Sequence, residues 1–174
     1  MELLEIMRRR HSIRKYTQES IRESELMKIL QAGLLSASGR RARPWEFIVV
    51  RDKEVLQRMA HARVGAAKML EGADCAIVVI ADPEKTDVWI EDCSITMANM
   101  HLMADSLGIG SCWIQGRLRE AEEGGTTEEF LRGLLGYPEE YKLEAILSLG
   151  MPGEEKAATE LEELPKEKVH WDTY

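Results

Sequence analysis

Apolar residues recur at helical spacing in several parts of the chain. Residues 2–9 predict a short helix, and a second helix is predicted over about 22–35 from the spacing of its leucines and isoleucines. Ser20 and Glu23 resemble a capping box, in which the two side chains satisfy free amides at a helix start. Residues 53–70 have an amphipathic helical pattern. The first 70 residues are therefore expected to be rich in helix.

Four short apolar stretches predict strands. Residues 45–50 follow a proline and read as a strand, and residues 73–81 form an apolar run typical of a strand buried on both faces. Residues 109–115 and 143–149 predict two further core strands. Gly110 lies inside the third strand, where a glycine indicates either the close approach of a ligand or another backbone, or a bulge.

Two more helices complete the predicted pattern. Residues 87–107 are apolar almost all round, which predicts a central buried helix that ends at Gly108. A helix over 127–135 is predicted with Thr126 or Thr127 as its cap. Strands separated by helices of unequal length indicate an α+β or α/β sandwich. The absence of a repeat or linker in the sequence predicts one domain over residues 1–174.

The C-terminal segment has a different character. Residues 153–174 are acidic and have no clear hydrophobic period. They still end in Val169, Trp171 and Tyr174, which a disordered tail would seldom retain. We therefore expect this segment to dock, and a partner subunit is the expected receptor.

Composition limits the classes of function. The chain of 174 residues is 44% hydrophobic and 31% charged, with a net charge of −8. No apolar run approaches the ~20 residues that span a bilayer, and the acidic start does not resemble a signal peptide. We therefore expect a cytoplasmic protein with no membrane partner. The overall acidity also argues against a nucleic-acid partner.

The three cysteines give no sign of cysteine or metal chemistry. Cys75, Cys93 and Cys112 form no CxxC motif, and their number is odd. A disulfide framework or a zinc site is therefore not expected. No sequence signal places a base beside any of them, so we expect no catalytic thiol.

Positive charge is concentrated near the N-terminus. Residues 1–51 hold 11 Lys/Arg and 6 Asp/Glu, whereas the remaining residues hold 12 and 25. Five of the nine residues from Arg8 to Tyr16 are cationic. Arginine donors suit a phosphate, and Ser12 and His11 add further polar groups. An alternative is a solvated helix end, where basic side chains are also favoured.

Four segments along the chain form a recognisable set. They are Arg10-His11-Ser12-Ile13-Arg14-Lys15-Tyr16; Ser36-Ala37-Ser38 with Pro44-Trp45-Glu46-Phe47; Asp92 through Leu107 with Gly108-Ile109-Gly110-Ser111-Cys112-Trp113; and Leu147-Ser148-Leu149-Gly150-Met151-Pro152 with Val169-His170-Trp171. In this order, the four segments resemble the nitroreductase family of FMN-dependent oxidoreductases. The first segment is similar to the family's Arg-x-Ser-x-Arg flavin-binding motif.

The resemblance implies a fold and a quaternary structure. The expected fold is a three-layer α/β/α sandwich of the α+β class, with a mixed sheet around the long buried helix. The expected assembly is an intertwined homodimer with two FMN molecules at the subunit interface. Such a dimer buries a large apolar area.

The resemblance also assigns FMN-binding roles to particular positions. Arg10 and Arg14 would contact the phosphate and the ribityl or ring oxygens, with Arg14, or Lys15 in its place, at the N1–O2 edge. The other implied contacts are His11 and Ser12; Ser36, Ala37 and Ser38 from the other subunit; Gly110, Ser111 and Cys112 along the flavin edge; and Lys156 near the phosphate, with Lys166 or Lys168 as weaker candidates.

The chain departs from the family pattern before Pro44. Arg41 and Arg43 stand where Asn and Gln are frequent, and Ala37 replaces a frequent Pro. An arginine there would hold a phosphate or a reduced flavin, or would point to solvent. These alternatives remain open at the level of sequence.

The implied reaction is a ping-pong electron transfer. NADH or NADPH would reduce the flavin at N5, and a nitroaromatic, a quinone or another flavin would reoxidise it. The flavin carries the chemistry, so no catalytic side-chain nucleophile is expected. The alternatives are a flavin-binding or flavin-sensing protein with little turnover, a specialised relative such as a dehalogenating flavoprotein, and an anion-binding structural domain.

Overall fold

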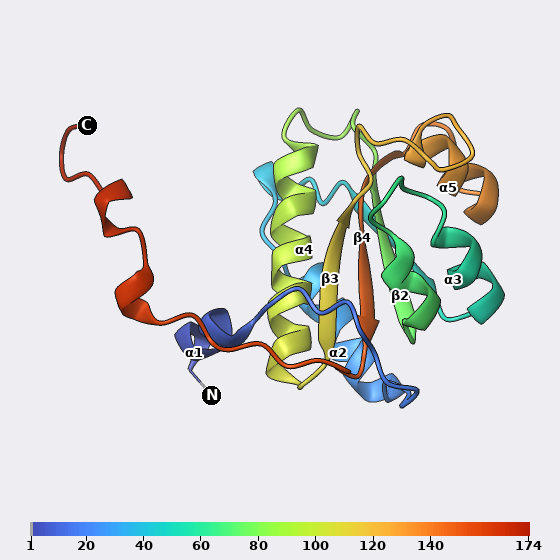
Figure 1. Cartoon of the computed structure of the whole chain (residues 1–174). Coiled ribbons are helices and arrows are strands. Elements are labelled where there is room, and N and C mark those ends of the chain that lie inside the picture. The colour runs from blue at the N-terminus through green and yellow to red at the C-terminus, as the bar shows by residue number, and fades with distance from the viewer. Residues whose placement is uncertain (1) are drawn as a thin grey trace.

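The computed structural model describes residues 2–174. Its centre is one sheet of four strands in the order β1-β2-β4-β3 (Figure 1). The strands are β1 (Trp45–Val50), β2 (Cys75–Ala81), β3 (Gly110–Gln115) and β4 (Lys142–Gly150). All four confirm strands predicted from the sequence.

The expected mixed sheet is wrong for these four strands, because every pair of neighbours is antiparallel. Strands β2 and β3 run in the same direction and are joined by helix α4 (Trp89–Ser106). However, β4 lies between them and runs the opposite way. In the described residues, the sheet's only parallel pairing is an isolated bridge between Ser12 and Ser111 at the free edge of β3.

Helices cover both faces of the sheet, which confirms the three-layer α/β/α sandwich. Helices α2 (Glu23–Leu34) and α4 pack on one face, with Ile29 and Met97 fully buried there. Helices α3 (Lys53–Met59) and α5 (Thr127–Leu135) pack on the other face. Side chains of β2 alternate between the two cores, and all seven of its residues are buried. Each large apolar side chain buried this way stabilises the fold by about 1.5–3 kcal/mol.

The helix predicted over 53–70 is shorter than expected. Helix α3 ends at Met59, turns follow, and a short 3-10 helix spans Lys68–Gly72. Gly65 in these turns has a φ of +68°, which lies outside the α-helical region. Asp52 begins α3, because its carboxylate accepts hydrogen bonds from the amides of Glu54 and Val55.

The predicted capping box at Ser20 and Glu23 is wrong. Helix α2 has Arg22 as its N-cap, and no side chain caps it. A capping box does occur at α5, where Thr126 and Glu129 exchange hydrogen bonds with each other's backbone amides. Thr126 is thus one of the two caps predicted for that helix.

Helix α4 is buried on one side only within the single chain. Met97, Met100 and Ala104 face the sheet and are buried. Ile95 and Ala98 are exposed, because no element of the same chain covers that side. The prediction that this helix is buried all round is therefore not met within the single chain.

The chain around Thr159 and Glu160 lies beside α1 (Leu3–Arg9). The amide of Thr159 donates to the carbonyl of Arg8, and the Arg8 guanidinium contacts Glu160 at 3.1 Å. Beyond this point the chain leaves the body of the molecule and extends away from it (Figure 1). Every residue from 161 to 174 is exposed. The tail therefore does not fold back on its own chain.

Candidate functional site

The basic N-terminal segment lies along the free edge of β3. The amide of Ile13 donates to the carbonyl of Ser111 at 2.9 Å. The next residues follow the end of β4, where the amide of Thr17 donates to the carbonyl of Met151 at 2.9 Å. The Tyr16 hydroxyl fixes the bend by donating to the Ile13 carbonyl at 2.8 Å. An exposed sheet edge offers unpaired backbone groups, and this segment satisfies some of them.

The segment that follows β4 returns to the basic N-terminal segment. The Glu154 carboxylate accepts hydrogen bonds from the amides of Arg14 and Lys15. The bond from Arg14 lowers the pKa of the Glu154 carboxyl. The Lys156 ammonium donates to the Ser12 carbonyl at 2.8 Å. Lys156, the favoured late lysine, therefore lies beside the basic segment.

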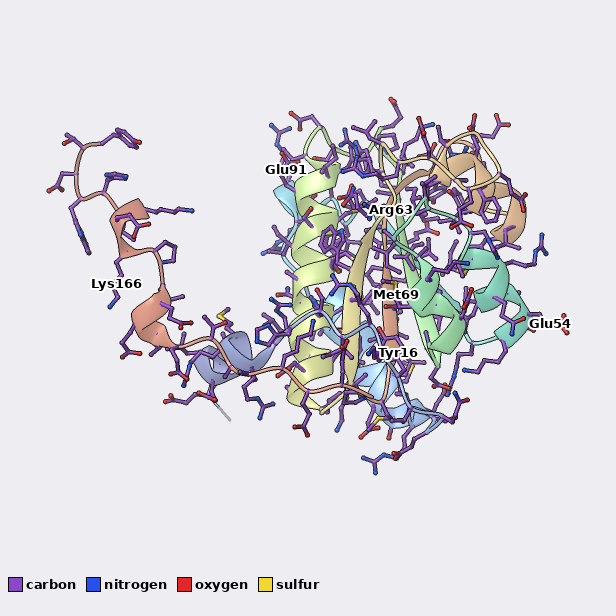
Figure 2. The ribbon with its side chains drawn as sticks, in the orientation of Figure 1. Tyr16, Glu54, Arg63, Met69, Glu91 and Lys166 are labelled. Carbon is purple, nitrogen blue, oxygen red and sulfur yellow. The ribbon has the colours of Figure 1, made fainter. Side chains whose placement is uncertain are left out.

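The weaker candidates Lys166 and Lys168 lie elsewhere. Both belong to a short 3-10 helix in the exposed tail. Figure 2 shows Lys166 on this tail, outside the body of the molecule. Neither lysine meets the basic segment within one chain.

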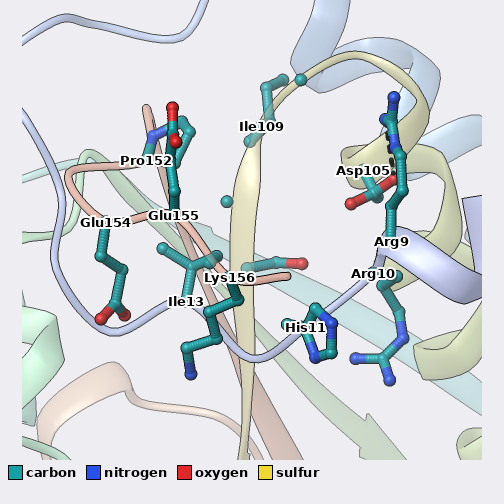
Figure 3. A pocket seen from close by; sticks show the side chains of 13 residues that line it. Arg9, Arg10, His11, Ile13, Asp105, Ile109, Pro152, Glu154, Glu155 and Lys156 are labelled. Atoms are coloured by element: carbon teal, nitrogen blue, oxygen red, sulfur yellow. Dashed lines mark hydrogen bonds and ion pairs between the residues drawn. The ribbon is translucent and has the colours of Figure 1, made fainter. Parts of the chain in front are cut away.

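A pocket of about 430 Å³ forms between the basic segment, the start of β3 and the returning C-terminal segment (Figure 3). The structure brings five of the predicted site residues into its lining: Arg10, His11, Gly110, Ser111 and Lys156. Arg9 and Asp105 also line it and pair with each other at 3.2 Å. The volume lies within the range of small-molecule sites.

Two side chains of the pocket, Arg10 and His11, have hydrogen-bonding capacity that the chain does not fully use. Arg10 forms no ion pair with a carboxylate among the described residues. The His11 Nε2 atom is buried and has no hydrogen-bond partner there. Two of the nearby carboxylates are already engaged, since Asp105 pairs with Arg9 and Glu154 binds backbone amides. A buried polar atom without a partner is costly, so this donor set fits an anionic or oxygen-rich ligand such as FMN.

A buried histidine joins two residues of this pocket. One Nη of Arg10 donates to His101 Nε2 at 3.0 Å, and His101 Nδ1 is hydrogen-bonded to the Ser111 hydroxyl. His101 was not predicted as a site residue, because a lone histidine in an apolar helix gives no signal of its partners. Burial, together with the Arg10 charge, lowers the pKa of His101 to about 4.

The depressed pKa of His101 predicts a loss of stability in mild acid. The unfolded histidine has a pKa of about 6.5, so between that value and about 4 only the unfolded chain takes up this proton. Acidification through this window therefore favours unfolding, by about 2 kcal/mol from about pH 7 to about pH 5. Urea unfolding at both pH values tests this in the wild type and in His101→Phe. The variant should lose less stability on acidification, and an equal loss in both proteins would contradict the prediction.

Five predicted site residues lie away from the pocket. Ser36, Ala37, Ser38, Arg41 and Arg43 follow the end of α2 and are not part of the pocket lining. Contacts with α4 position this loop: Asn99 donates to the Ser36 hydroxyl at 2.8 Å, and Asp92 accepts from the amide of Gly39 at 2.8 Å.

The three arginines of this loop have unusual backbone angles. Arg40, Arg41 and Arg43 have φ values of 51°, 59° and 46°. Such angles are uncommon for residues other than glycine and cost free energy. Arg41 and Arg43 have exposed side chains.

The remaining predicted contacts, Ser12, Arg14 and Cys112, do not line this pocket. The Ser12 carbonyl accepts hydrogen bonds from Lys156 and from the Arg14 guanidinium at 3.4 Å. Arg14 itself is exposed and does not line the pocket. Cys112 is buried in β3, and its thiol contacts the carbonyl of Trp113.

Gly110 is explained by a close approach within the chain. A Cβ atom there would lie 2.8 Å from Ile13 Cγ2 and 3.2 Å from the carbonyl oxygen of Gly150. The close approach predicted from the sequence is thus made by the basic segment and by β4.

Gly110→Ala is expected to push Ile13 away from β3 and to destabilise the fold by about 1–3 kcal/mol, as overpacking does. Urea unfolding measures this. The matched control is Gly133→Ala, because that glycine is exposed in α5 and a Cβ there meets nothing within 4 Å. We expect the free energy of unfolding of the control to rise by about 1 kcal/mol, because alanine has a higher helix propensity than glycine. Equal stability of Gly110→Ala and the wild type would contradict the packing argument.

No helix of residues 2–174 is both long and apolar enough to cross a membrane. The same part of the chain has no cluster of three or more side chains suited to hold a metal ion.

The chain is similar to several known proteins. The family model described as the nitroreductase family matches residues 7–68 and 59–151. A protein from Archaeoglobus fulgidus, provisionally named NADH dehydrogenase/NAD(P)H nitroreductase, is 41% identical over 89% of this chain and 88% of its own length. An FMN-dependent nitroreductase from Clostridium difficile has a TM-score of 0.95 at 42% identity, covering 98% of this chain and 99% of its own.

A more distant structure has the same fold. A nitroreductase-like protein from Desulfovibrio desulfuricans, solved in complex with FMN, has a TM-score of 0.80 at 24% identity. The superposition covers 100% of this chain and 98% of the Desulfovibrio desulfuricans chain. With a family model that spans most of the sequence and a relative 41% identical over most of its length, the chain belongs to the nitroreductase family.

Proposed function

We propose that this protein is an FMN-dependent oxidoreductase that passes electrons from NADH or NADPH to a small acceptor. Family membership and the names of its relatives support the proposal. The observation that carries it is the unused hydrogen-bonding capacity in the pocket, above all the remaining donors of Arg10 and the buried, unpartnered His11 Nε2. Bound FMN would supply the redox chemistry: hydride acceptance from the nicotinamide and, in a separate ping-pong step, electron transfer to the acceptor.

We assign different contacts with this cofactor to different residues in and around the pocket. Arg10, His11 and Lys156 offer cationic or ring donors for the phosphate and ribityl oxygens. The backbone from Gly110 to Ser111 borders the same space. Arg14 extends from the basic segment and is assigned to the N1–O2 edge, where a positive group stabilises negative charge on the ring.

We further propose that the site is completed by a second copy of the chain. Ser36, Ala37, Ser38, Arg41 and Arg43 do not line the pocket of their own subunit, so they would reach the cofactor of the partner. The expected acceptors are a nitroaromatic, a quinone or another flavin.

Exposed apolar surface supports a homodimer. Leu3 and Leu4 on α1 and Leu35 after α2 are 59%, 53% and 85% exposed. Ile95 is exposed on the uncovered side of α4. A groove of about 280 Å³ runs between α1, the end of α2 and α4. Large exposed apolar side chains beside an apolar groove are typical of an interface between subunits.

The visible absorption spectrum tests the cofactor assignment. The purified protein is measured before and after incubation with excess FMN and desalting. We expect the desalted protein to retain absorption bands at about 370 and about 450 nm, which are characteristic of oxidised flavin. A protein that stays colourless after incubation would contradict the proposed function and would leave an anion-binding domain as the explanation of the pocket.

A further inference from the structure

We propose that His101 is a positioning residue for the cofactor pocket: it holds the Arg10 guanidinium and orients the Ser111 hydroxyl so that both can donate to the ligand. This inference rests on the proposed function, because FMN is the ligand it concerns. His101 itself does not line the pocket, whereas Arg10 and Ser111 do. Its effect on binding must therefore pass through these two neighbours.

The chemistry of the three groups fixes the direction of both hydrogen bonds. The Arg10 guanidinium is always protonated and has no acceptor atom, so it donates to His101 Nε2. Nε2 must then carry a lone pair, which leaves the ring proton on Nδ1. Nδ1 therefore donates to the Ser111 oxygen. Because its oxygen is the acceptor, the Ser111 hydroxyl keeps its own proton free to donate into the pocket.

The surroundings of His101 keep this arrangement in place. The ring is only 7% exposed and Ser111 only 2%. Arg10 faces the ring from the basic segment and Ser111 faces it from β3. On its own helix the nearest acid is Asp105, one turn on, whose carboxylate pairs with Arg9. A positive charge without a facing carboxylate, combined with burial, keeps the imidazole neutral and able to accept from Arg10.

Two substitutions separate the hydrogen bond from the space that the ring fills. His101→Phe keeps a ring of similar size but removes both hydrogen bonds. His101→Gln keeps an acceptor near the position of Nε2. FMN affinity is measured by titrating the flavin fluorescence. We expect FMN to bind about tenfold more weakly to His101→Phe, as for one lost hydrogen bond to a charged group. His101→Gln should recover most of that loss.

A double-mutant cycle tests whether the effect passes through Arg10. In an Arg10→Ala background, His101→Phe should weaken FMN binding by less than about threefold, because no guanidinium remains to be held. Met97→Leu, a buried change of similar volume in the same helix, is the control for packing and should bind FMN like the wild type.

The outcomes distinguish this inference from the proposed function. Equal FMN affinity of the wild type and His101→Phe would overturn the positioning role while leaving the cofactor assignment intact. The same holds if His101→Gln binds as weakly as His101→Phe, or if the losses simply add in the Arg10→Ala background. A wild-type protein that binds no FMN would overturn both the proposed function and this inference.

Discussion

Replacing Arg10 and Arg14 together by alanine is expected to weaken FMN binding by at least about tenfold, because each charge-assisted hydrogen bond contributes about 1.5–3 kcal/mol. Arg10 lines the pocket, and one Nη group is held by His101 while the guanidinium has further donors. Arg14 is exposed, and its guanidinium makes only a 3.4 Å contact with the Ser12 carbonyl. Both side chains therefore have donors available for a ligand.

The measurement is a fluorescence titration of FMN with each protein. Arg58→Ala with Arg63→Ala is the matched control, because it removes the same charge away from the basic segment, in α3 and the turns that follow it. The control should bind FMN as the wild type does. Unchanged affinity in the Arg10/Arg14 variant would show that the basic segment does not hold the cofactor.

Removing residues 161–174 is expected to weaken the proposed homodimer strongly. This tail leaves the body of the chain and exposes large apolar side chains, with Val169 60%, Trp171 84% and Tyr174 104% exposed. A tryptophan buried at an interface typically contributes 2 kcal/mol or more, which is about a thirtyfold change in the dissociation constant. Loss of the whole tail should exceed this.

Light scattering over a range of protein concentrations measures the dissociation constant of the dimer. Trp171→Ala with Val169→Ala tests the apolar contacts without shortening the chain. Glu162→Ala with Glu163→Ala changes two exposed residues of the same tail and should leave the dimer intact. If the truncated protein dimerises as tightly as the full chain, the tail is not part of the interface.

The strands and most helices could be predicted because their signals are local. The apolar run of β2 and the Thr126 cap of α5 need only neighbouring residues to be recognised. The break after Met59 was missed, since an amphipathic pattern continues across Gly65 although the backbone does not. The antiparallel sheet was missed because the insertion of β4 between β2 and β3 is a long-range event.

The candidate site shows the same division between local and long-range information. Arg10 and His11 stand out as part of a charged run in an acidic chain, and Lys156 follows from the family resemblance. Neither a charged run nor the family resemblance indicates His101 or Glu154 as a site residue. They matter only because folding brings distant parts of the chain together. His101 in α4 meets Arg10, which is 91 positions earlier, and Glu154 meets the amide of Arg14, which is 140 positions earlier.

The central claim is that this protein carries electrons from a nicotinamide to an acceptor through bound FMN. Anaerobic mixing of the FMN-loaded protein with NADH or NADPH, followed at the flavin absorbance near about 450 nm, tests it most directly. The account predicts rapid bleaching by one or both nicotinamides, and recovery of the absorbance when a quinone or a nitroaromatic is added. A protein that retains FMN but is not bleached would contradict the enzymatic claim and would identify it as a flavin-binding protein without turnover.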